Sequence, residues 1–503
     1  MPKTIFHTTE KSNFILNMDL DKFRVFCSKL LAIMMSIVGA SEMVFQLSYD
    51  YTSKFNEMIR DGGFGVVVAL TIVTLRSIAT IFSIVGVLVI VAAFIGGMRQ
   101  QIPKKNLLPF ALLGAGFLWA VVSLFNSFSY RDSLFGQDGR DEGLFTLLIY
   151  SALYLVGSML RRKENIRRTI NLVLGFGLFQ CIWGLVQCIP FSEFPNAYKF
   201  VDPLLLQNSF LPCGLTDSPI TFAMLLTMLI CLAVPAAIYA EKKAQRIYAV
   251  ICAGVFWLLL LKTQTIASVL GAGFTALLTL ILLIVSGKKK QGKPLGLLLT
   301  MVLSIGVSVV WVYFSPSING TYTTWNNAPI ENGFAVRDGG IIWDDGFYRL
   351  STAAPYASFD EHDFEIGDAS SVIRYAWDEG VRTIKAYPVV GTGPDCFWYM
   401  QLHESMELLS NSNGVDRPYN DFLYIAATRG IPALLLYVAL VAVSIWYGIK
   451  RRKQTASWVY LSAIFAVIGF LLTSMVGISV LTVSPLLWMM LGVMVGEPID
   501  NKA

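Results

Sequence analysis

The sequence predicts an all-α polytopic membrane protein, and three observations support this prediction. Of the 503 residues, 55% are hydrophobic and only 15% are charged, whereas about a quarter of an ordinary soluble domain is charged. Apolar runs recur along the chain at close to the length of about 20 residues that a membrane span needs. Basic residues gather in short loops between these runs. We therefore expect about 12 transmembrane helices and one large polar insert.

The predicted spans follow directly from the apolar runs. Residues 1–314 hold nine of them, residues 315–420 form the polar insert, and residues 421–503 hold the last three. The spans are Leu30–Leu47, Ser77–Gly97, Leu107–Asn126, Gly143–Leu160, Thr169–Pro190, Pro219–Ala240, Ile247–Leu261, Ile266–Ser286, Pro294–Phe314, Asp421–Ile449, Ser457–Gly477 and Leu481–Gly496.

The basic loops predict how the chain is oriented, because short loops rich in Lys and Arg stay in the cytoplasm. When twelve spans alternate, these loops all fall on one side of the membrane. They are the segments 99–105, 161–168, 242–246, 288–293 and 450–453. We therefore expect both termini in the cytoplasm and the insert outside it.

The insert 315–420 leans acidic, with 15 Asp and Glu against six Lys and Arg. It lacks the basic groove that a nucleic acid requires, so we expect no nucleic-acid partner. Gly333–Leu350 has the pattern of a short β-hairpin, and Ser370–Ala386 has helical spacing. The expected apolar face of that helix consists of Val372, Tyr375, Val381 and Ile384.

Two short motifs shape the backbone where the insert ends. Gly391, Gly393 and Pro394 predict a tight turn, because glycine tolerates positive φ and proline fixes its own φ. The same residues fit a plain turn without a functional role equally well. Asn420 is placed to orient a neighbour or to cap a helix that begins near Asp421.

The residue types limit the chemistry that the chain can perform. The three histidines, His7, His362 and His403, have no second His or Cys at the spacing of a zinc site. A phosphate-binding loop ending in Lys-Ser or Lys-Thr does not occur either. We therefore expect neither a metal nor a cofactor.

Arginines supply the more informative pattern. By the predicted topology Arg76, Arg140, Arg374, Arg417 and Arg429 lie near the outer membrane face. A guanidinium binds phosphate oxygens in a bidentate manner and stays charged when partly buried, so these side chains suit a lipid-diphosphate headgroup. Ion pairing is the simpler alternative, for example Arg374 with Asp378, or Arg429 with Asp421.

From about Gly136 to Gly496 the chain resembles the O-antigen ligase and polymerase family of bacterial membrane glycan transferases. The similar segments are Gly136–Gly143, Arg374-Tyr-Ala-Trp377, Lys385–Phe397 with its Gly-Thr-Gly-Pro turn, Arg417–Leu423 and Ala427–Pro432. Two positions depart from the family pattern. Tyr419 stands where the family usually has His before Asn, and the stretch Thr263–Ser268 lacks the arginine that commonly follows Ser there.

The resemblance implies a GT-C-like helical fold in the bacterial cytoplasmic (inner) membrane. It implies metal-independent transfer of a glycan from an undecaprenyl diphosphate carrier to an acceptor hydroxyl, with membrane lipids around the protein. The acceptor would be a glycan, a lipid or a cell-wall polymer, and the sequence does not separate a ligase from a polymerase. The family's diphosphate-binding role carries over to Arg374, and we expect help from Arg140, Arg417 and Arg76.

The family's acceptor-activating role carries over less directly, because a phenol such as Tyr419 has a pKa of about 10 and is a poor base. We therefore consider Asp421 and His403, with Asp416, as alternative bases. Two other functions stay open: a polysaccharide transporter or flippase, and a protein that binds lipid-linked glycan without turnover.

Overall fold

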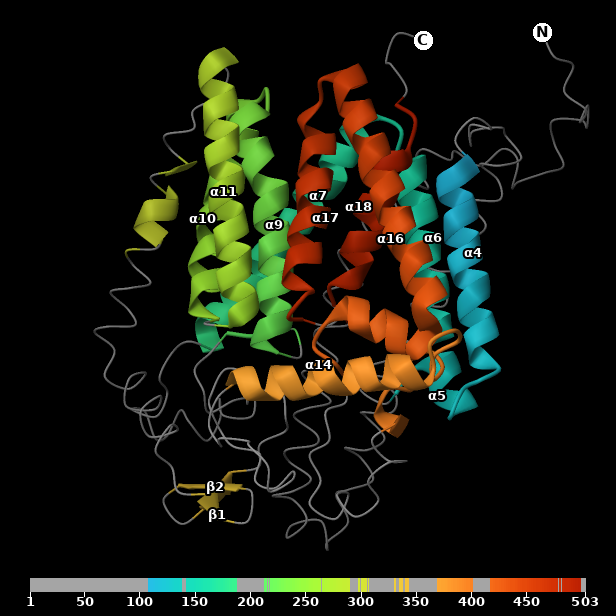
Figure 1. The fold of residues 1–503 in the computed structure, drawn as a ribbon. Coiled ribbons are helices and arrows are strands. Elements are labelled where there is room, and N and C mark those ends of the chain that lie inside the picture. Colours follow the sequence, from blue (N-terminus) through green and yellow to red (C-terminus); the bar gives the residue numbers. More distant parts are fainter. Residues whose placement is uncertain are drawn as a thin grey trace, which may run out of the picture.

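The computed structural model describes most of the chain after its first hundred residues. The described residues are 107–137, 142–187, 212–214, 216, 218–263, 265–289, 297–298, 300–304, 306, 330–331, 334–337, 340–342, 369–400, 417–477, 479–480 and 482–498. Within them, long helices stand side by side as a bundle, and one further helix lies across an end of that bundle (Figure 1).

Nine of the predicted spans coincide with helices that the structure describes. They are α4 (Leu107–Leu124), α6 (Leu144–Met159), α7 (Lys163–Gln187), α9 (Pro219–Tyr239), α10 (Lys243–Lys262), α11 (Ile266–Lys289), α16 (Asp421–Thr455), α17 (Trp458–Thr473) and α18 (Ser484–Val495). Six of them have the length and apolar composition to cross a membrane, and α6, α17 and α18 are shorter apolar helices. The predicted spans 30–47 and 77–97 lie outside the described residues, and 294–314 is described only in part. The helices are those of a multi-pass membrane protein.

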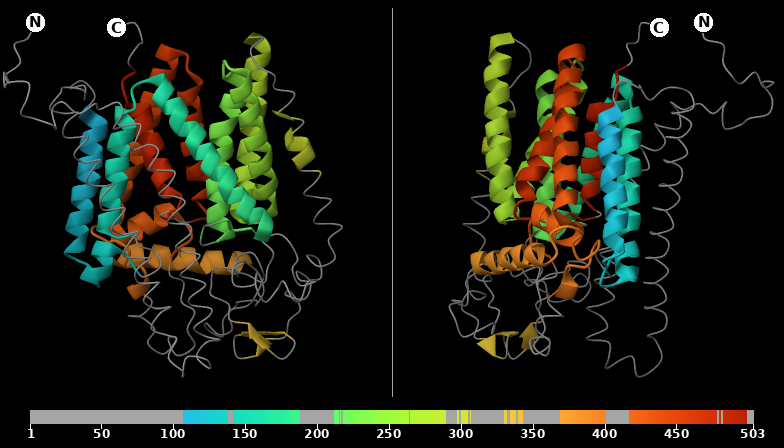
Figure 2. Two further views of the ribbon diagram at one scale, coloured as in Figure 1. Left: turned by 180° about the vertical axis from the view of Figure 1, so that it is seen from behind. Right: turned by 45° about the vertical axis from the view of Figure 1, so that its right-hand side comes forward.

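Helix α9 forms the centre of the bundle. Every residue from Pro219 to Ile238 is buried, and a helix that is apolar all round has to be surrounded by other helices. The surrounding helices are α7, α10, α11 and α17. Figure 2 shows α7 running obliquely across the back of the bundle.

Helices α6 and α18 pack closely because glycine lies at their contact. A Cβ atom on Gly157 would overlap the carbonyl oxygen of Met489, and one on Gly492 would overlap the carbonyl oxygen of Tyr154. Small residues that let two backbones approach are typical of helix pairs in membranes. This contact fixes α6, and therefore the loop that precedes it, against the last helix of the chain.

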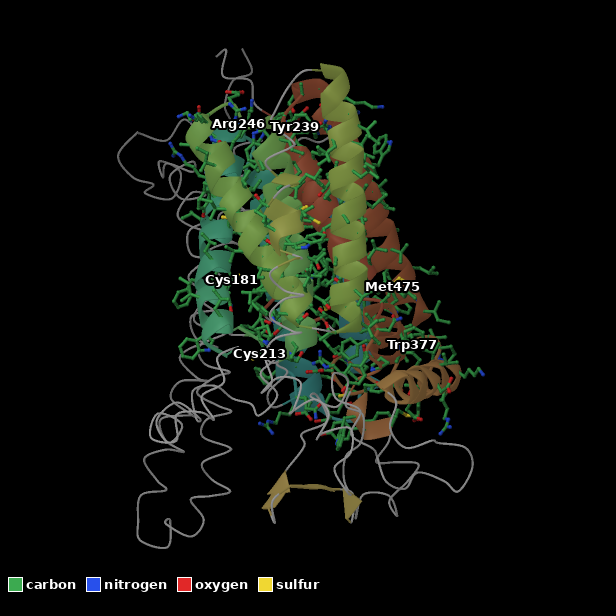
Figure 3. All side chains as sticks on the ribbon, turned by 90° about the vertical axis from the view of Figure 1, so that its left-hand side faces the viewer. Cys181, Cys213, Tyr239, Arg246, Trp377 and Met475 are labelled. Atoms are coloured by element: carbon green, nitrogen blue, oxygen red, sulfur yellow. The ribbon has the colours of Figure 1, made fainter. Side chains whose placement is uncertain are left out.

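The two ends of the bundle differ in composition. At one end, here called the basic end, Lys163 pairs with Glu241 at 3.2 Å and Arg452 lies 5.9 Å from the ring of Tyr239. The basic loops 161–168, 242–246 and 450–453 therefore share this end. Figure 3 shows Arg246 there, whereas Trp377 lies toward the opposite end.

The opposite end, here called the motif end, carries α5 (Tyr130–Phe135), the transverse helix α14 (Ala369–Ala386) and the loop 387–397. The insert also contains strands β1 (Ile330–Glu331), β2 (Phe334–Arg337) and β3 (Gly340–Ile342). Strands β2 and β3 pair antiparallel, with Val336 opposite Ile341. They are the two arms of the predicted hairpin.

Helix α14 forms where the sequence predicts it, but the expected apolar face is wrong at Val381, which is 40% exposed. The buried residues of α14 are small or polar, namely Ala376, Glu379, Gly380 and Thr383. The reason is close packing, because a Cβ atom on Gly380 would lie 3.0 Å from Cβ of Pro418. Ile384 of the expected face is partly buried and packs against the cluster of Phe397, Tyr424 and Ala427, whereas the side chains of Val372 and Tyr375 lie outside the described residues.

Candidate functional site

A kink in α16 is the first feature of the motif end. Gly430 has a φ of 84°, which breaks the helical path, and Pro432 has no N–H group to donate to Thr428. The N–H of Ile431 donates to the carbonyl of Pro388 at 2.9 Å instead of to its own helix. The carbonyl groups of Ala427 and Thr428 are therefore left without their helical donors.

The Gly-Thr-Gly-Pro turn supplies the missing donors. The N–H of Thr392 donates to the carbonyl of Ala427 at 3.1 Å, and that of Gly393 donates to the carbonyl of Thr428 at 2.9 Å. Gly391 and Gly393 both have positive φ, at 69° and 102°. A Cβ atom on Gly391 would overlap the backbone of Thr428. The predicted turn therefore exists, and its glycines allow backbone to lie directly on backbone.

The end of α4 holds the same junction from another side. Trp119 Nε1 donates to the carbonyl of Arg429 at 3.1 Å, and Asn126 Nδ2 donates to that of Gly391 at 3.0 Å. Ser123 Oγ lies within hydrogen-bonding distance of the carbonyls of Val390 and Thr428. Segments far apart in the sequence are thus joined at one place.

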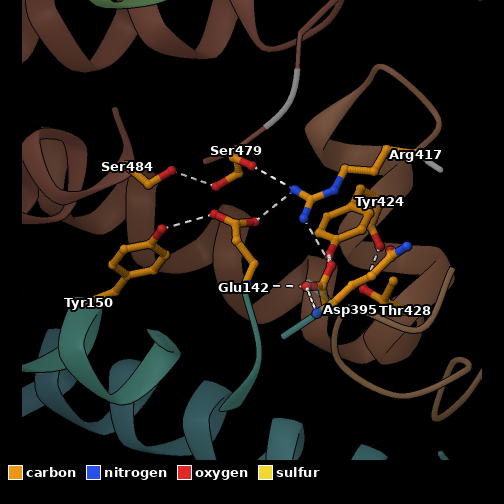
Figure 4. Close-up of polar contacts among 9 residues, drawn as sticks. Glu142, Tyr150, Asp395, Arg417, Tyr424, Thr428, Ser479 and Ser484 are labelled. Atoms are coloured by element: carbon orange, nitrogen blue, oxygen red, sulfur yellow. Dashed lines mark hydrogen bonds and ion pairs between the residues drawn. The ribbon is translucent and has the colours of Figure 1, made fainter. Parts of the chain in front are cut away.

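Arg417 lies at the centre of a buried charged cluster next to this junction (Figure 4). Its side chain is fully buried and forms ion pairs with Glu142 at 3.2 Å and Asp395 at 2.9 Å. It also donates to the carbonyl of Ser479 at 2.8 Å and lies 4.8 Å from the ring centre of Tyr424. The cluster joins the loop before α6, the loop 387–397 and the start of α16.

Each carboxylate of this cluster has further partners. Asp395 accepts hydrogen bonds from the N–H groups of Gln137 at 2.8 Å and Glu142 at 3.1 Å, and from the hydroxyl of Tyr424. Glu142 accepts a hydrogen bond from the hydroxyl of Tyr150 at 2.9 Å. Burial raises the pKa of Glu142 from its ordinary value of 4.5 to about 7, although the positive charge of Arg417 acts in the opposite direction.

Tyr419, Asn420 and Asp421 lead from this cluster into α16. Tyr419 is 3% exposed, has a φ of 44°, and its carbonyl accepts a bond from Trp377 Nε1 at 3.4 Å. Asn420 Oδ1 caps the helix by accepting from the N–H groups of Phe422 and Leu423 at 3.0 and 3.1 Å. Asp421 is 3% exposed.

A second polar group surrounds Cys396 beside α5. Its sulfur lies 3.1 Å from Ser133 Oγ and 3.4 Å from Ser127 Oγ, and burial raises the pKa of this thiol. Tyr399 donates to Asp132 at 2.6 Å. Among the described residues, no group of three His, Cys, Asp or Glu side chains could hold a metal ion.

The structure therefore brings Gly391, Gly393, Pro394, Arg417 and Asp421 to the motif end, together with Tyr419 and Asn420. Arg374 lies in α14 one turn before Trp377, but its side chain is not among those that the structure describes. Arg76, Arg140 and His403 also lie outside the described residues.

Sequence reasoning missed Glu142, Asp395 and Tyr424 as partners of Arg417. Asp395 and Glu142 each stood inside a segment that resembles the family, but sequence separation hides the contact, since Glu142 and Arg417 are 275 residues apart. The available signal was the occurrence of a carboxylate in each of two motif segments and an arginine in the third.

Comparisons with known proteins agree with the motifs. A search of curated proteins found no matching sequence. The sequence model of a family described as O-antigen ligase matches residues 215–438, a range that includes α14, the Gly-Thr-Gly-Pro turn, Arg417 and the kink of α16. Residues 215–438 of this chain are therefore similar to the O-antigen ligase family.

Proposed function

We propose that the protein transfers a glycan from an undecaprenyl diphosphate carrier to an acceptor hydroxyl at the motif end of the bundle. The observation that supports this proposal best is that three motif segments, which contain Glu142, Asp395 and Arg417, contact one another around the Arg417 side chain. Buried ion pairs with Glu142 and Asp395 hold these segments in a single arrangement. A transferase needs such rigidity, because reacting groups have to be held within about 3 Å of one another.

The proposed orientation places the motif end outside the cytoplasm. The basic loops that the structure describes share the other end, and such loops stay in the cytoplasm. On this basis we propose a bacterial inner-membrane protein with both termini in the cytoplasm and the insert 315–420 outside. Twelve spans in a GT-C-like arrangement complete this proposal.

Arginines are proposed to bind the diphosphate of the donor. Departure of the carrier diphosphate builds up negative charge, and preorganised guanidinium groups stabilise that charge without a metal. We assign this role to Arg374, with Arg140 and Arg76 as helpers. Arg417 is assigned a positioning role, because two buried carboxylates already neutralise its charge.

The acceptor hydroxyl must lose its proton during transfer. The proposed candidates for this step are Asp421, Tyr419 and His403. A free aspartate has a pKa of about 3.9 and is ionised at neutral pH, whereas a phenol such as that of Tyr419 has a pKa of about 10 and is protonated there. Asn420 caps the helix on which Asp421 stands and so fixes where the carboxylate lies.

Reconstitution of the purified protein with an undecaprenyl-diphosphate oligosaccharide tests the proposal, with products separated by gel. We expect Arg374→Ala to abolish product at normal expression. Arg382→Ala is the matched control, because Arg382 lies on the same helix and its side chain is 60% exposed. Product from Arg374→Ala at the wild-type level would remove Arg374 from the mechanism.

The form of the product identifies the acceptor class. A ladder of lengths indicates a polymerase, whereas a single transfer to added lipid or protein indicates a ligase. The presence of Tyr419 favours one other function, which is binding of lipid-linked glycan without turnover. If catalysis was lost at this position, Tyr419→His should restore or raise transfer.

A further inference from the structure

Polar side chains gather beside the kink of α16, and two of their atoms have no hydrogen-bond partner in the described part of the chain. Asp421 Oδ1 and Tyr437 Oη form no hydrogen bond in the described part of the chain, although their residues are only 3% and 8% exposed. Leaving a buried polar atom unpaired costs about 1–3 kcal/mol. Two such atoms together indicate a place that a polar ligand group completes.

These two groups interact electrostatically, although they lie on opposite sides of the kink in the sequence. The positive φ of Gly430 turns the segment 421–429 away from the rest of α16. The rings of Phe422 and Tyr437, on opposite sides of the kink, consequently lie 6.3 Å apart. Trp488 of α18 lies 6.2 Å from Tyr437 and supports the ring from the other side.

Arg429 adds a positive charge to this group of side chains. It is half-buried, and its guanidinium has no ion pair or hydrogen bond among the described residues. It interacts electrostatically with both Asp421 and Tyr437. The backbone of Ser479 also hydrogen-bonds the Asp421 carboxylate, and its carbonyl accepts from Arg417. The backbone of Ser479 therefore connects Asp421 to the charged cluster of Figure 4.

We propose that these side chains bind the acceptor hydroxyl and that Asp421 takes its proton, an inference that rests on the proposed glycan transfer. The hydroxyl proton moves to Asp421 Oδ1 while the acceptor oxygen forms a bond to the anomeric carbon. The bond between that carbon and the carrier oxygen breaks, and its electron pair leaves on the diphosphate. Tyr437 and Arg429 are positioning residues that orient the acceptor hydroxyl and the carboxylate.

Kinetics of reconstituted variants with varied acceptor concentration test this inference. General base catalysis contributes about 10²–10⁴-fold, so Asp421→Asn should lower kcat by that factor. Tyr437→Phe should raise the KM for the acceptor about tenfold while its Tm stays equal to wild type or rises, because it removes an unpaired buried hydroxyl. Tyr460→Phe, a buried tyrosine in α17, is the matched control.

The outcomes separate the inference from the proposed function. Asp421→Asn and Tyr437→Phe could both show wild-type kinetics while transfer still depends on Arg374. This result would overturn the role of Asp421 and Tyr437 in binding the acceptor and leave the proposed function unchanged. A lower Tm of Tyr437→Phe without a change in KM would show a purely structural hydroxyl and overturn the positioning role. Folded wild-type protein that transfers nothing would overturn both proposals.

Discussion

The region around α9 and the motif end are both buried, but different interactions hold them together. Helix α9 is enclosed on all sides by apolar side chains, and no single contact dominates there. At the motif end a fully buried arginine, two buried carboxylates and backbone hydrogen bonds between loops fix the geometry. Dispersion contacts in the first region are individually small and replaceable. The buried charges of the second region cannot be replaced one at a time, because each charge depends on its partner.

This difference indicates a division of roles between the two regions. Apolar packing around α9 supplies a stable frame that tolerates exchange of similar side chains. The motif end needs one exact backbone path, because its carbonyls at the α16 kink are paired only when the glycine turn lies directly against them. Changes at the motif end should therefore affect activity and stability together, whereas changes around α9 should affect stability alone.

The largest effect is expected for Arg417→Ala. Removing one member of a buried ion pair costs about 3–5 kcal/mol, since the buried carboxyl groups of Glu142 and Asp395 both lose their cationic partner. Unfolding in mixed detergent measures this loss, with a thiol dye reporting exposure of the buried cysteines. Transfer activity per folded molecule should fall as well.

A core variant provides the comparison. Leu229→Ala in α9 removes a fully buried side chain and should cost about 2–5 kcal/mol, but the folded fraction should keep its activity. Equal loss of activity per folded molecule in both variants would abolish the distinction between the regions.

A pH-dependent effect of about 3 kcal/mol is expected from Glu142. Its pKa in the folded protein is about 7 instead of 4.5, so the folded state holds this proton more tightly than the unfolded state. The stabilisation is complete below about pH 4.5 and is lost as pH rises to 7. Over this range the unfolding free energy of wild type should fall relative to that of Glu142→Gln. Parallel pH profiles of the two proteins would contradict the assignment.

Gly430→Ala should cost about 2 kcal/mol, from backbone strain at positive φ and displacement of the loop 387–397. The added Cβ would overlap the carbonyl of Val389. Gly114→Ala is a matched control, because Gly114 lies inside α4 with no atom within 4 Å of the new methyl group. That control should stabilise the helix by about 0.5–1 kcal/mol. A neutral Gly430→Ala would show that the loop adapts to the kink.

The helices could be predicted from the sequence, whereas the contacts between them could not. Apolar length is a local property, so spans such as 219–240 and 421–449 were found close to their observed limits. The motif segments, the turn at Gly391–Pro394 and the hairpin were also recognisable from local patterns. Pairing of Arg417 with Glu142 depends on how α6 packs against α18, which no local pattern encodes.

The predicted apolar face of α14 was wrong at Val381 for a related reason. Periodicity assumes that apolar side chains face the protein, but α14 lies at the end of the bundle and packs through Gly380 against Pro418. Close backbone approach there favours small residues and leaves Val381 exposed. The unpaired atoms of Asp421 and Tyr437 were equally hidden, because their proximity depends on the kink at Gly430.

The smallest effect, about 1 kcal/mol, is expected for Asn420→Ala, and it tests why Asn stands in the motif. Its Oδ1 caps two N–H groups of α16, and its Nδ2 donates to the carbonyl of Met475 at 3.1 Å. Asn420→Ser should keep the cap and lose only the second bond.

If Asn420→Ser retains stability but loses activity, the bond to Met475 sets the direction of the 421–429 segment. If Asn420→Ala loses stability, Asn420→Ser retains it and both keep their activity per folded molecule, Asn420 only caps the helix. A change at Asn420 would then affect stability alone, as a change around α9 does, and the part of the motif end whose changes also affect activity would begin after Asn420.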